Sequence, residues 1–336
     1  GKVVAGDALQ KLAGLRPRNH EHTHLVGQVI ETYGAIGWHV LLDPVVVQTL
    51  GRTGADDVEA VSAFTTDREL RMHATEIGER MHLTTEDRLW MGISLFWSFG
   101  CVNALFAVMT HGGTLVLQHH FEAGEALSLI EKERCSVFYG TPNMALELSR
   151  HPDKENRDLS ALRTGAAIGT PEQMQMVVDL GAQEICNVYG LTEAYGNSAV
   201  TDSRAPVEYR LNASGEPLEG VEMKVLDLET GKPLPPGNLG EIALRGRLMP
   251  GYLDDPSTTK ASMTMDGFLL TGDLGVLDEK GWIQFQGRKK ELIKSGGINI
   301  SPAEIETVLC QHNAVESAYV VGLPNTTLDQ SVGAVL

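Results

Sequence analysis

The sequence predicts an α/β protein with a large N-terminal domain of parallel sheets covered by helices, plus a β-rich subdomain. A small α+β C-terminal domain, cut short, follows. Three observations predict this fold class. The middle third alternates short β-rich runs with helical patterns, which is typical of a parallel sheet covered by helices. After Tyr209, strands separated by Gly- and Pro-rich turns replace the helices. Near Gly287 the pattern changes again, and the chain stops inside a strand-like run, Ser331–Leu336.

The middle third is expected to alternate strands and helices of ordinary length. Leu127 and Ile130 face inward in the first helix, and Thr141 and Thr170 each precede a proline at the start of a helix. A Thr side chain can cap the free amides there, and proline is tolerated at the first helical position. The expected elements are strand Thr114–Gln118, helix Glu125–Arg134, strand Cys135–Tyr139, helix Pro142–Arg150, helix Pro171–Gly181 and strand Glu184–Val188.

The last third predicts a β-rich subdomain and then a new domain. Strands Val221–Leu226 and Glu241–Arg245 belong to a subdomain of about residues 210–286. Ser301 starts a helix with a capping-box pattern, because Glu304 follows three residues later. A strand from Ser317 to Val321 comes next. We place the boundary close to residue 288, which gives domains 1–288 and 289–336.

Length and composition limit the function classes. The 336 residues suggest two domains. The formal net charge of −17 argues against a nucleic-acid partner, because such partners need basic patches. It does not exclude one nucleotide. No apolar run approaches the ~18 residues of a membrane-spanning helix. Four dispersed cysteines suggest reduced thiols and a cytoplasmic location. The oligomeric state is not visible.

Three motifs contain residue types that suit a nucleotide. Tyr189–Glu193 follows a strand directly, at the edge where open α/β sheets bind ligands. Its Thr hydroxyl and Glu carboxylate suit a phosphate oxygen and Mg²⁺. Leu270–Asp273 places an Asp on a Gly turn, where it can accept two bonds from ribose hydroxyls. Gly287–Gly297 couples a cationic run to a Ser-Gly-Gly turn. Taken singly, each is also compatible with an ordinary turn or a solvated linker.

Together, the order of these motifs resembles the adenylate-forming superfamily, which contains acyl-CoA synthetases, firefly-type luciferases and peptide-synthetase adenylation domains. The pattern is Tyr-Gly-x-Thr-Glu, Gly-Glu-Ile with Gly251–Tyr252, Thr-Gly-Asp, and Gly-Arg-x-Lys-Glu-Leu-Ile-x-x-Gly-Gly-x-Asn-Ile. The resemblance runs from about Leu89 to Leu336. Further matches are Leu95–Gly100, His111–Thr114 and Phe138–Pro142.

The resemblance implies an acyl-CoA synthetase that uses ATP, Mg²⁺ and coenzyme A on a small carboxylic acid. Lys290 is expected at the hinge about which the small domain rotates, and Gly296 and Gly297 are expected to let the pantetheine arm pass close to the backbone. The implied cofactor-binding residues are Asn187 and Tyr189 at adenine, the adjacent Gly190, Thr192 at phosphate, and Asp273 with Arg288 at the ribose, and Glu193 is the implied Mg²⁺ ligand. Thr192, Glu193 and Lys290 are the implied catalytic residues.

The acid itself is not readable from the sequence. The candidate pocket mixes bulky and small side chains, which allows an aromatic or a short-to-medium aliphatic acid. Two alternatives stay open: an adenylating enzyme that delivers the acyl group to a carrier-protein thiol or an amine, and a catalytically inactive nucleotide- or acyl-binding relative. The pocket candidates are Trp97, Phe99, Ala166, Ala167, Tyr195 and Gly196.

Two elements of the family pattern are absent. Asp56–Phe64 resembles the strand before the family's glycine-rich phosphate loop, and Thr65–Leu70 resembles the stretch after it, with nothing between them. The segment with the catalytic lysine would lie beyond Leu336. The chain is therefore degenerate, an engineered fragment, or missing mobile segments. We expect the third case, in which Phe64 and Thr65 would lie much farther apart than the ~3.8 Å of consecutive Cα atoms.

Overall fold

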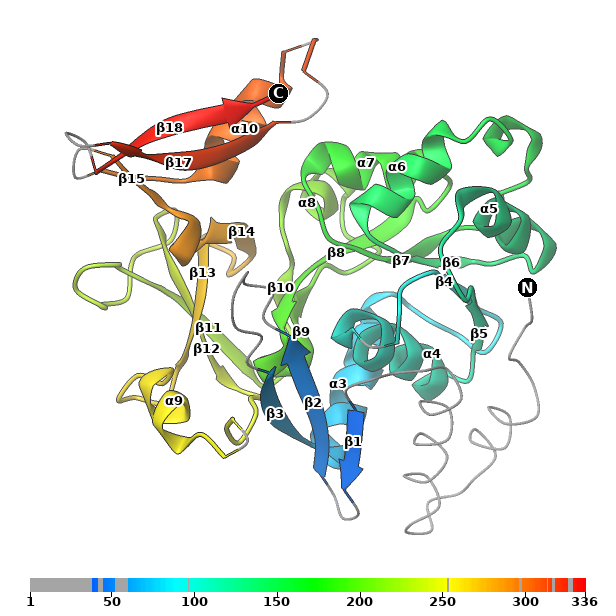
Figure 1. Ribbon diagram of the computed structural model, residues 1–336. Helices are drawn as coiled ribbons and strands as arrows, with labels where there is room; N and C mark the ends of the chain where they lie inside the picture. Colours follow the sequence, from blue (N-terminus) through cyan, green and yellow to red (C-terminus); the bar gives the residue numbers. More distant parts are fainter. Residues whose placement is uncertain are drawn as a thin grey trace. The chain divides into compact units, whose positions relative to one another are not determined.

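The computed structural model describes residues 38–41, 45–51, 60–95, 97–252, 254–295, 298–312, 314–315, 318–325 and 329–336 (Figure 1). The chain divides into two compact units. One unit comprises residues 1–221 and 246–261, and the other comprises residues 222–245 and 262–336. The parallel sheet lies in the first unit. The antiparallel sheet formed after residue 220 and the C-terminal sheet lie in the second.

A seven-stranded sheet organises the first unit. Its strand order is β10-β9-β8-β7-β6-β4-β5, and the neighbours from β8 to β5 pair in parallel. Strands β9 and β10 continue the sheet in antiparallel pairing. The strands are β4 (Arg88–Met91), β5 (Thr114–Leu117), β6 (Val137–Tyr139), β7 (Thr164–Ala167), β8 (Glu184–Leu191), β9 (Gly196–Val200) and β10 (Glu216–Pro217).

Helices cover both faces of this sheet (Figure 1). Successive strand residues point to opposite faces, so one strand serves two cores. Leu89 and Met91 join one apolar cluster, whereas Trp90 between them joins the other, with Phe138. One face carries α5 (Ala123–Lys132), α6 (Pro142–Arg150), α7 (Pro171–Asp179) and α8 (Val207–Asn212); the other carries α3 (Asp67–Arg80), the π-helix η1 (Phe99–Leu105) and α4 (Phe106–Thr110).

The helix starts confirm the capping argument at two of three places. Thr141 accepts a hydrogen bond from the Met144 amide, and Thr170 forms a full capping box with Gln173. The capping box predicted at Ser301 is wrong. Ser301 precedes α10 (Pro302–Cys310), but its hydroxyl donates to the carbonyl of Gln286 at 3.1 Å instead. The side chain thus ties the helix start to a strand rather than to its own first turn.

A three-stranded antiparallel sheet precedes α3. It consists of β1 (Trp38–Leu41), β2 (Val45–Gly51) and β3 (Ala60–Thr66). Phe64 and Thr65 pair with the consecutive residues Val47 and Val46 of β2, so β3 is unbroken. The omission expected between Phe64 and Thr65 stays a prediction. Of the strand predicted from Asp56, residues 56–59 lie outside the described part.

The second unit contains two antiparallel sheets. Its first sheet has the order β11-β12-β13-β14, and its second has the order β16-β15-β18-β17. Phe268 packs with Leu226 and Ala243 in a small core. The first residue of β11 and the last residue of β12 belong to the first unit. The strands are β11 (Val221–Leu226), β12 (Leu239–Gly246), β13 (Leu269–Leu277), β14 (Ile283–Arg288), β15 (Ile293–Ser295), β16 (Ile298–Ile300), β17 (Tyr319–Asn325) and β18 (Asp329–Val335).

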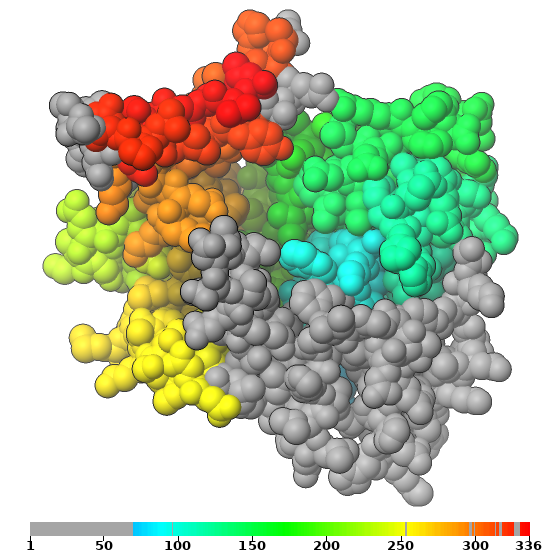
Figure 2. All heavy atoms as spheres, in the orientation of Figure 1, coloured from blue at the N-terminus to red at the C-terminus, as the bar shows by residue number. Residues whose placement is uncertain are grey.

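The predicted fold class is confirmed: a parallel sheet with helices, then antiparallel sheets, then a small C-terminal piece. Strands β17 and β18, red in Figure 2, lie at the surface, and Tyr319 and Val335 expose more than half of their area. The boundary near residue 288 stays a prediction. Among the described residues, no helix is long and apolar enough to cross a membrane.

Candidate active site

The first half of the predicted site lies at the carboxyl edge of the parallel sheet. Strands β6, β7 and β8 run in parallel, so their ends meet at one edge. Ala166 pairs with Tyr139 on one side, and Ala167 pairs with Asn187 on the other. Strand β8 continues three residues past the predicted end, to Leu191. It thus delivers the Tyr189–Glu193 motif directly to this edge.

Thr192 and Glu193 form a short 3-10 turn, η3 (Thr192–Ala194), after β8. Thr192 is buried, and Glu193 is half-buried. The segment after β12 holds Glu193 twice. The Tyr252 hydroxyl donates to Glu193 Oε1 at 2.8 Å, and the Met249 amide donates to the Glu193 carbonyl at 2.7 Å. Both ends of Glu193, backbone and carboxylate, are therefore fixed.

The neighbouring nucleotide candidates are buried in the same strand. Tyr189 is only 4% exposed, and Asn187 is 3% exposed. The side-chain oxygen of Asn187 accepts from the Val188 amide at 2.9 Å, so its amide nitrogen is the group suited to a further acceptor. A Cβ on Gly190 would lie 1.7 Å from the Gly196 carbonyl oxygen. Only glycine allows β8 and β9 to approach this closely.

The six pocket candidates occupy different environments. Ala166, Ala167 and Gly196 are buried, and the Phe99 ring lies 4.5 Å from the Tyr139 ring centroid. Tyr195 is buried as well, in a left-handed conformation with φ of 62°. Trp97, by contrast, exposes 63% of its area. The exposed indole, just before the π-helix, is therefore not a core residue.

A buried polar chain behind this edge was missed by the sequence analysis. The Nε2 atom of His73 lies 3.3 Å from Asn103 Oδ1, and Asn103 donates to Asn197 at 2.9 Å. Asn197 in turn donates to the Tyr139 hydroxyl at 3.3 Å. Burial lowers the pKa of His73 to about 4, so the imidazole is neutral. The residues come from α3, η1, β9 and β6, and no local pattern signals that they meet.

The second half of the predicted site lies in the second unit. Asp273 on β13 pairs with Arg288 on β14, and Arg288 Nε lies 2.9 Å from Asp273 Oδ1. Asp273 is 1% exposed, whereas the Arg288 side chain is 46% exposed. Thr271 donates to the Ile242 carbonyl at 2.7 Å and accepts from the Asp273 amide at 3.1 Å. The Thr-Gly-Asp turn is thus fixed by strand pairing and by its own hydroxyl.

Glu241, which the sequence analysis did not assign to the site, clamps this turn. Its carboxylate accepts from the Gly272 amide at 3.2 Å and from Lys289 Nζ at 2.6 Å, although Glu241 is only 6% exposed. The neighbouring Lys290, in η4 (Lys289–Glu291), is exposed. Gly296 and Gly297 lie outside the described residues. Glu241 could have been suspected from its place in the Gly-Glu-Ile motif.

The residues present fit Mg²⁺ only together with a ligand that brings its own oxygens. No group of three or more His, Cys, Asp or Glu side chains in the described ranges could hold a metal. Magnesium usually takes one or two carboxylates plus substrate phosphates. Within the same ranges, Tyr252 is the one hydrogen-bond donor to the Glu193 carboxylate, at Oε1. Oε2 is therefore the oxygen suited to such an ion.

The fold and these motifs define an adenylate-forming enzyme scaffold. The chain belongs to the family of AMP-binding enzymes, whose family model matches residues 62–253. It is 36% identical over 269 residues to a putative acyl-CoA synthetase, YngI, of Bacillus subtilis, covering 78% of this chain and 49% of that protein. The chain thus spans about half the length of the curated relatives it matches.

Solved structures show the same architecture. ATP-bound MatB from Rhodopseudomonas palustris superimposes with a TM-score of 0.77 and 26% identity, covering 86% of this chain and 56% of that one. The o-succinylbenzoate CoA synthetase MenE from Bacillus subtilis, in complex with an acyl-adenylate intermediate, gives a TM-score of 0.73 and 27% identity. That match covers 86% of this chain and 58% of MenE. The predicted membership of the adenylate-forming superfamily is confirmed.

Proposed function

We propose that this protein is an AMP-forming acid–thiol ligase, which converts a carboxylic acid to an acyl-adenylate and then to a coenzyme A thioester. The observation that carries the proposal is the Thr192–Glu193 turn at the carboxyl edge of the parallel sheet, with its carboxylate held at 2.8 Å by Tyr252. The similarity to a putative acyl-CoA synthetase and to a CoA synthetase seen with an acyl-adenylate supports it.

The chemistry explains why the site needs these residue types. A carboxylate is a poor acyl donor, because its leaving group would be oxide. Transfer to the α-phosphate of ATP releases pyrophosphate and gives the acid a leaving group that a thiolate can displace. Two anions must meet in the first step, so charge must be offset at the phosphate. Bound Mg²⁺ would supply part of that positive charge, with Glu193 as its protein ligand.

The other residues act on the nucleotide and the acyl chain. Asp273 would accept from the ribose hydroxyls, with Arg288 beside it, and Thr192 would donate to a phosphate oxygen. Tyr189 and Asn187 would contact adenine. Lys290 would serve as the hinge residue, and Gly296 and Gly297 would border the pantetheine arm. The acid, aromatic or short-to-medium aliphatic, would meet Trp97, Phe99, Ala166, Ala167, Tyr195 and Gly196.

The acceptor is the finer part of the proposal. Coenzyme A is favoured, because the relatives are named as CoA ligases and synthetases. A carrier-protein thiol or an amine would use the same adenylate. A strict requirement of product formation for coenzyme A separates the first case from the other two. The predicted cytoplasmic location stays a prediction.

A second candidate is a nucleotide- or acyl-binding protein without turnover. The sequence favours it, because Thr65 follows Phe64 directly where the family pattern places its phosphate loop. A loop of backbone amides around the phosphates is part of how such enzymes offset charge. Without it, binding of ATP can persist while the chemical step slows.

One pair of measurements tests both candidates. ATP binding is measured by calorimetry with Mg²⁺, and pyrophosphate release is measured with ATP over a panel of carboxylic acids. Binding together with acid-dependent release supports the ligase. Binding without release for any acid supports the inactive relative. Absence of ATP binding would contradict both.

A further inference from the structure

The segment that holds Glu193 is itself held by a buried ion pair. We call residues 247–252 the anchor segment. Arg247, at its start, places Nη2 at 2.6 Å from Glu76 Oε1 of helix α3. The side chains are only 8% and 13% exposed. Removing one partner of such a pair leaves a poorly solvated charge, so the pair constrains the segment strongly.

The anchor segment is fixed at both ends. A Cβ on the preceding Gly246 would lie 1.9 Å from the Gly220 carbonyl oxygen. The backbone at Gly246 therefore packs directly against the backbone at Gly220. At the far end, the Tyr252 amide donates to Thr259 Oγ1 of helix α9 (Pro256–Ala261) at 2.9 Å. Between these two ties, Met249 and Tyr252 make their hydrogen bonds to Glu193.

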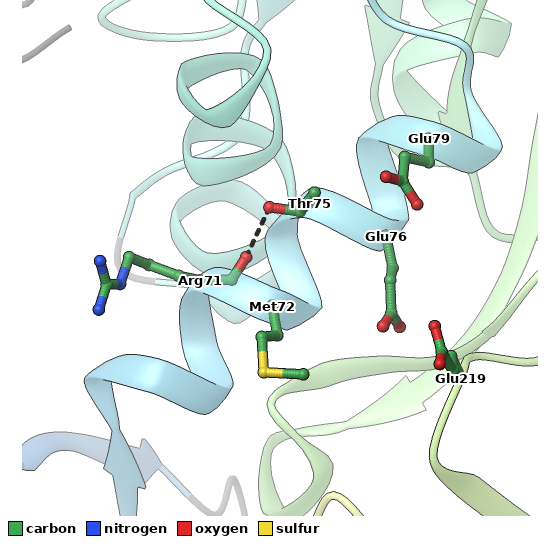
Figure 3. Close-up of a pocket in the computed structure, with 6 residues that line it drawn as sticks. All are labelled: Arg71, Met72, Thr75, Glu76, Glu79 and Glu219. Carbon is green, nitrogen blue, oxygen red and sulfur yellow. Dashed lines mark hydrogen bonds between the residues drawn. The ribbon is translucent and has the colours of Figure 1, made fainter.

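An open cavity of about 370 Å³ lies on the α3 side of the pair, lined by Arg71, Met72, Thr75, Glu76, Glu79 and Glu219. Figure 3 shows Glu76 and Glu219 pointing toward each other, while Arg71 points away. Three of the six lining residues are glutamates, and Glu76 forms its ion pair with Arg247, which is not part of the lining. The cavity therefore gives the pair access to solvent on one side but does not add a separate site.

We propose that Tyr252 is a positioning residue that orients the Glu193 carboxylate toward the metal of a metal–ATP complex, and that the Arg247–Glu76 pair fixes Tyr252 for this task. The inference rests on the proposed function, because it takes Glu193 as the metal ligand. Tyr252 occupies Oε1, which directs Oε2 to the ion. A carboxylate without this bond would rotate, and its affinity for the ion would fall.

The experiment measures metal binding directly. Mn²⁺ replaces Mg²⁺, and free Mn²⁺ is followed by electron paramagnetic resonance with saturating ATP. ATP binding in EDTA is measured by calorimetry. Tyr252→Phe, which removes one hydroxyl, should weaken Mn²⁺ binding about tenfold to a hundredfold, the usual size of a hydrogen bond to a charged group. ATP binding in EDTA and the melting temperature should stay at their original values.

A second variant tests the anchor. Glu76→Gln keeps the shape but removes the charge opposite Arg247, and it should weaken Mn²⁺ binding about threefold. If both residues act through Glu193, the double variant should show less than the product of the single effects. Tyr209→Phe is the matched control. Its helix α8 contacts the opposite end of β8 through Arg210, which donates to Gln183 and Ile185 carbonyls.

Three results would overturn the inference. Unchanged Mn²⁺ affinity in Tyr252→Phe would remove the positioning role. In the same variant, an equal loss of ATP affinity in EDTA, or a lower melting temperature that tracks the loss, would show a structural role instead. The third result concerns the wild type. If ATP bound to the protein has the same affinity for Mn²⁺ as free ATP, Glu193 is not a metal ligand, and the inference fails with the proposed metal role.

Discussion

The two halves of the candidate site are built in different ways. In the first unit, Thr192 and Glu193 follow a strand of a seven-stranded sheet between two large apolar clusters. In the second unit, Asp273 and Arg288 lie on an antiparallel pair of strands whose compact core contains Leu226, Ala243 and Phe268. Core packing and the buried Arg247–Glu76 pair orient the first half, whereas the partly exposed cations Arg288 and Lys289 clamp the second.

The two halves are therefore sensitive to different substitutions. The first half depends on buried neutral groups, such as His73 and Asn103, that are costly to charge or to leave unpaired. The second half depends on Glu241, which spans Gly272 and Lys289. Substitutions that remove one charge should therefore disturb the second half locally, and protonation should weaken the first half as a whole.

The largest effect is expected when the central carboxylates are removed. Glu193→Gln and Asp273→Ala should each reduce acid-dependent pyrophosphate release by about a hundredfold to a thousandfold, the range for lost charge stabilisation in a transition state. Circular dichroism should show both variants folded. Near-normal turnover in either variant would contradict the role of that half. If the wild type releases no pyrophosphate, the ATP affinities of the two variants are compared with that of the wild type by calorimetry.

The next effect concerns pH and the first unit. The pKa of His73 falls from 6.5 to about 4 on folding, because burial disfavours the charged ring. Between these values the unfolded chain binds a proton that the folded chain does not, so the free energy of unfolding falls as the pH falls through this window. The total is roughly 3 kcal/mol. Above pH 6.5 the contribution is fully present.

His73→Gln tests this sign, because Gln can still donate to Asn103 and does not titrate. Urea unfolding of wild type and variant is compared above pH 6.5 and near the lower pKa. The wild type should lose roughly 3 kcal/mol more than the variant. Parallel losses in the two proteins would show that other groups govern the acid sensitivity of the first unit.

A smaller effect is expected from the clamp in the second unit. Glu241→Gln removes the charge opposite Lys289 and weakens the bond to the Gly272 amide, so ATP affinity should fall about fivefold, with about 1 kcal/mol lost in stability. Calorimetry measures the ATP affinity, and urea unfolding measures the stability. Glu222→Gln is the matched control: the Glu222 side chain is 59% exposed, against 8% for Glu241, so no measurable loss of stability is expected. Equal effects of the two would refute the clamp.

Much of the fold could be predicted from local patterns. The alternation of strands and helices in the middle third, and the caps at Thr141 and Thr170, depend on residues within four positions of each other. The helix after Glu122 starts two residues earlier than predicted, because the Glu122 side chain caps the amides of Gly124 and Glu125. Such a cap competes with the pattern of apolar residues, which alone does not fix helix ends.

The motifs of the site could also be predicted from the sequence, but the contacts that hold their side chains in place could not. Thr192, Glu193 and Asp273 stand out by their order along the chain. The bond from Tyr252 to Glu193 joins residues 59 positions apart, and the clamp from Lys289 to Glu241 joins residues 48 apart. These contacts follow from strand register and helix packing, which no short window of sequence contains.

The fold class, the strands and helices of the middle third and the family of the chain could be predicted from sequence, because periodicity, caps and motifs are local properties of neighbouring residues. The tertiary structure alone decided that Arg247 reaches Glu76, that Tyr252 holds Glu193, and that a neutral His73 lies in a buried polar chain. The physical reason is that burial and pairing energies depend on which distant segments exclude water together, and only the packed chain specifies them.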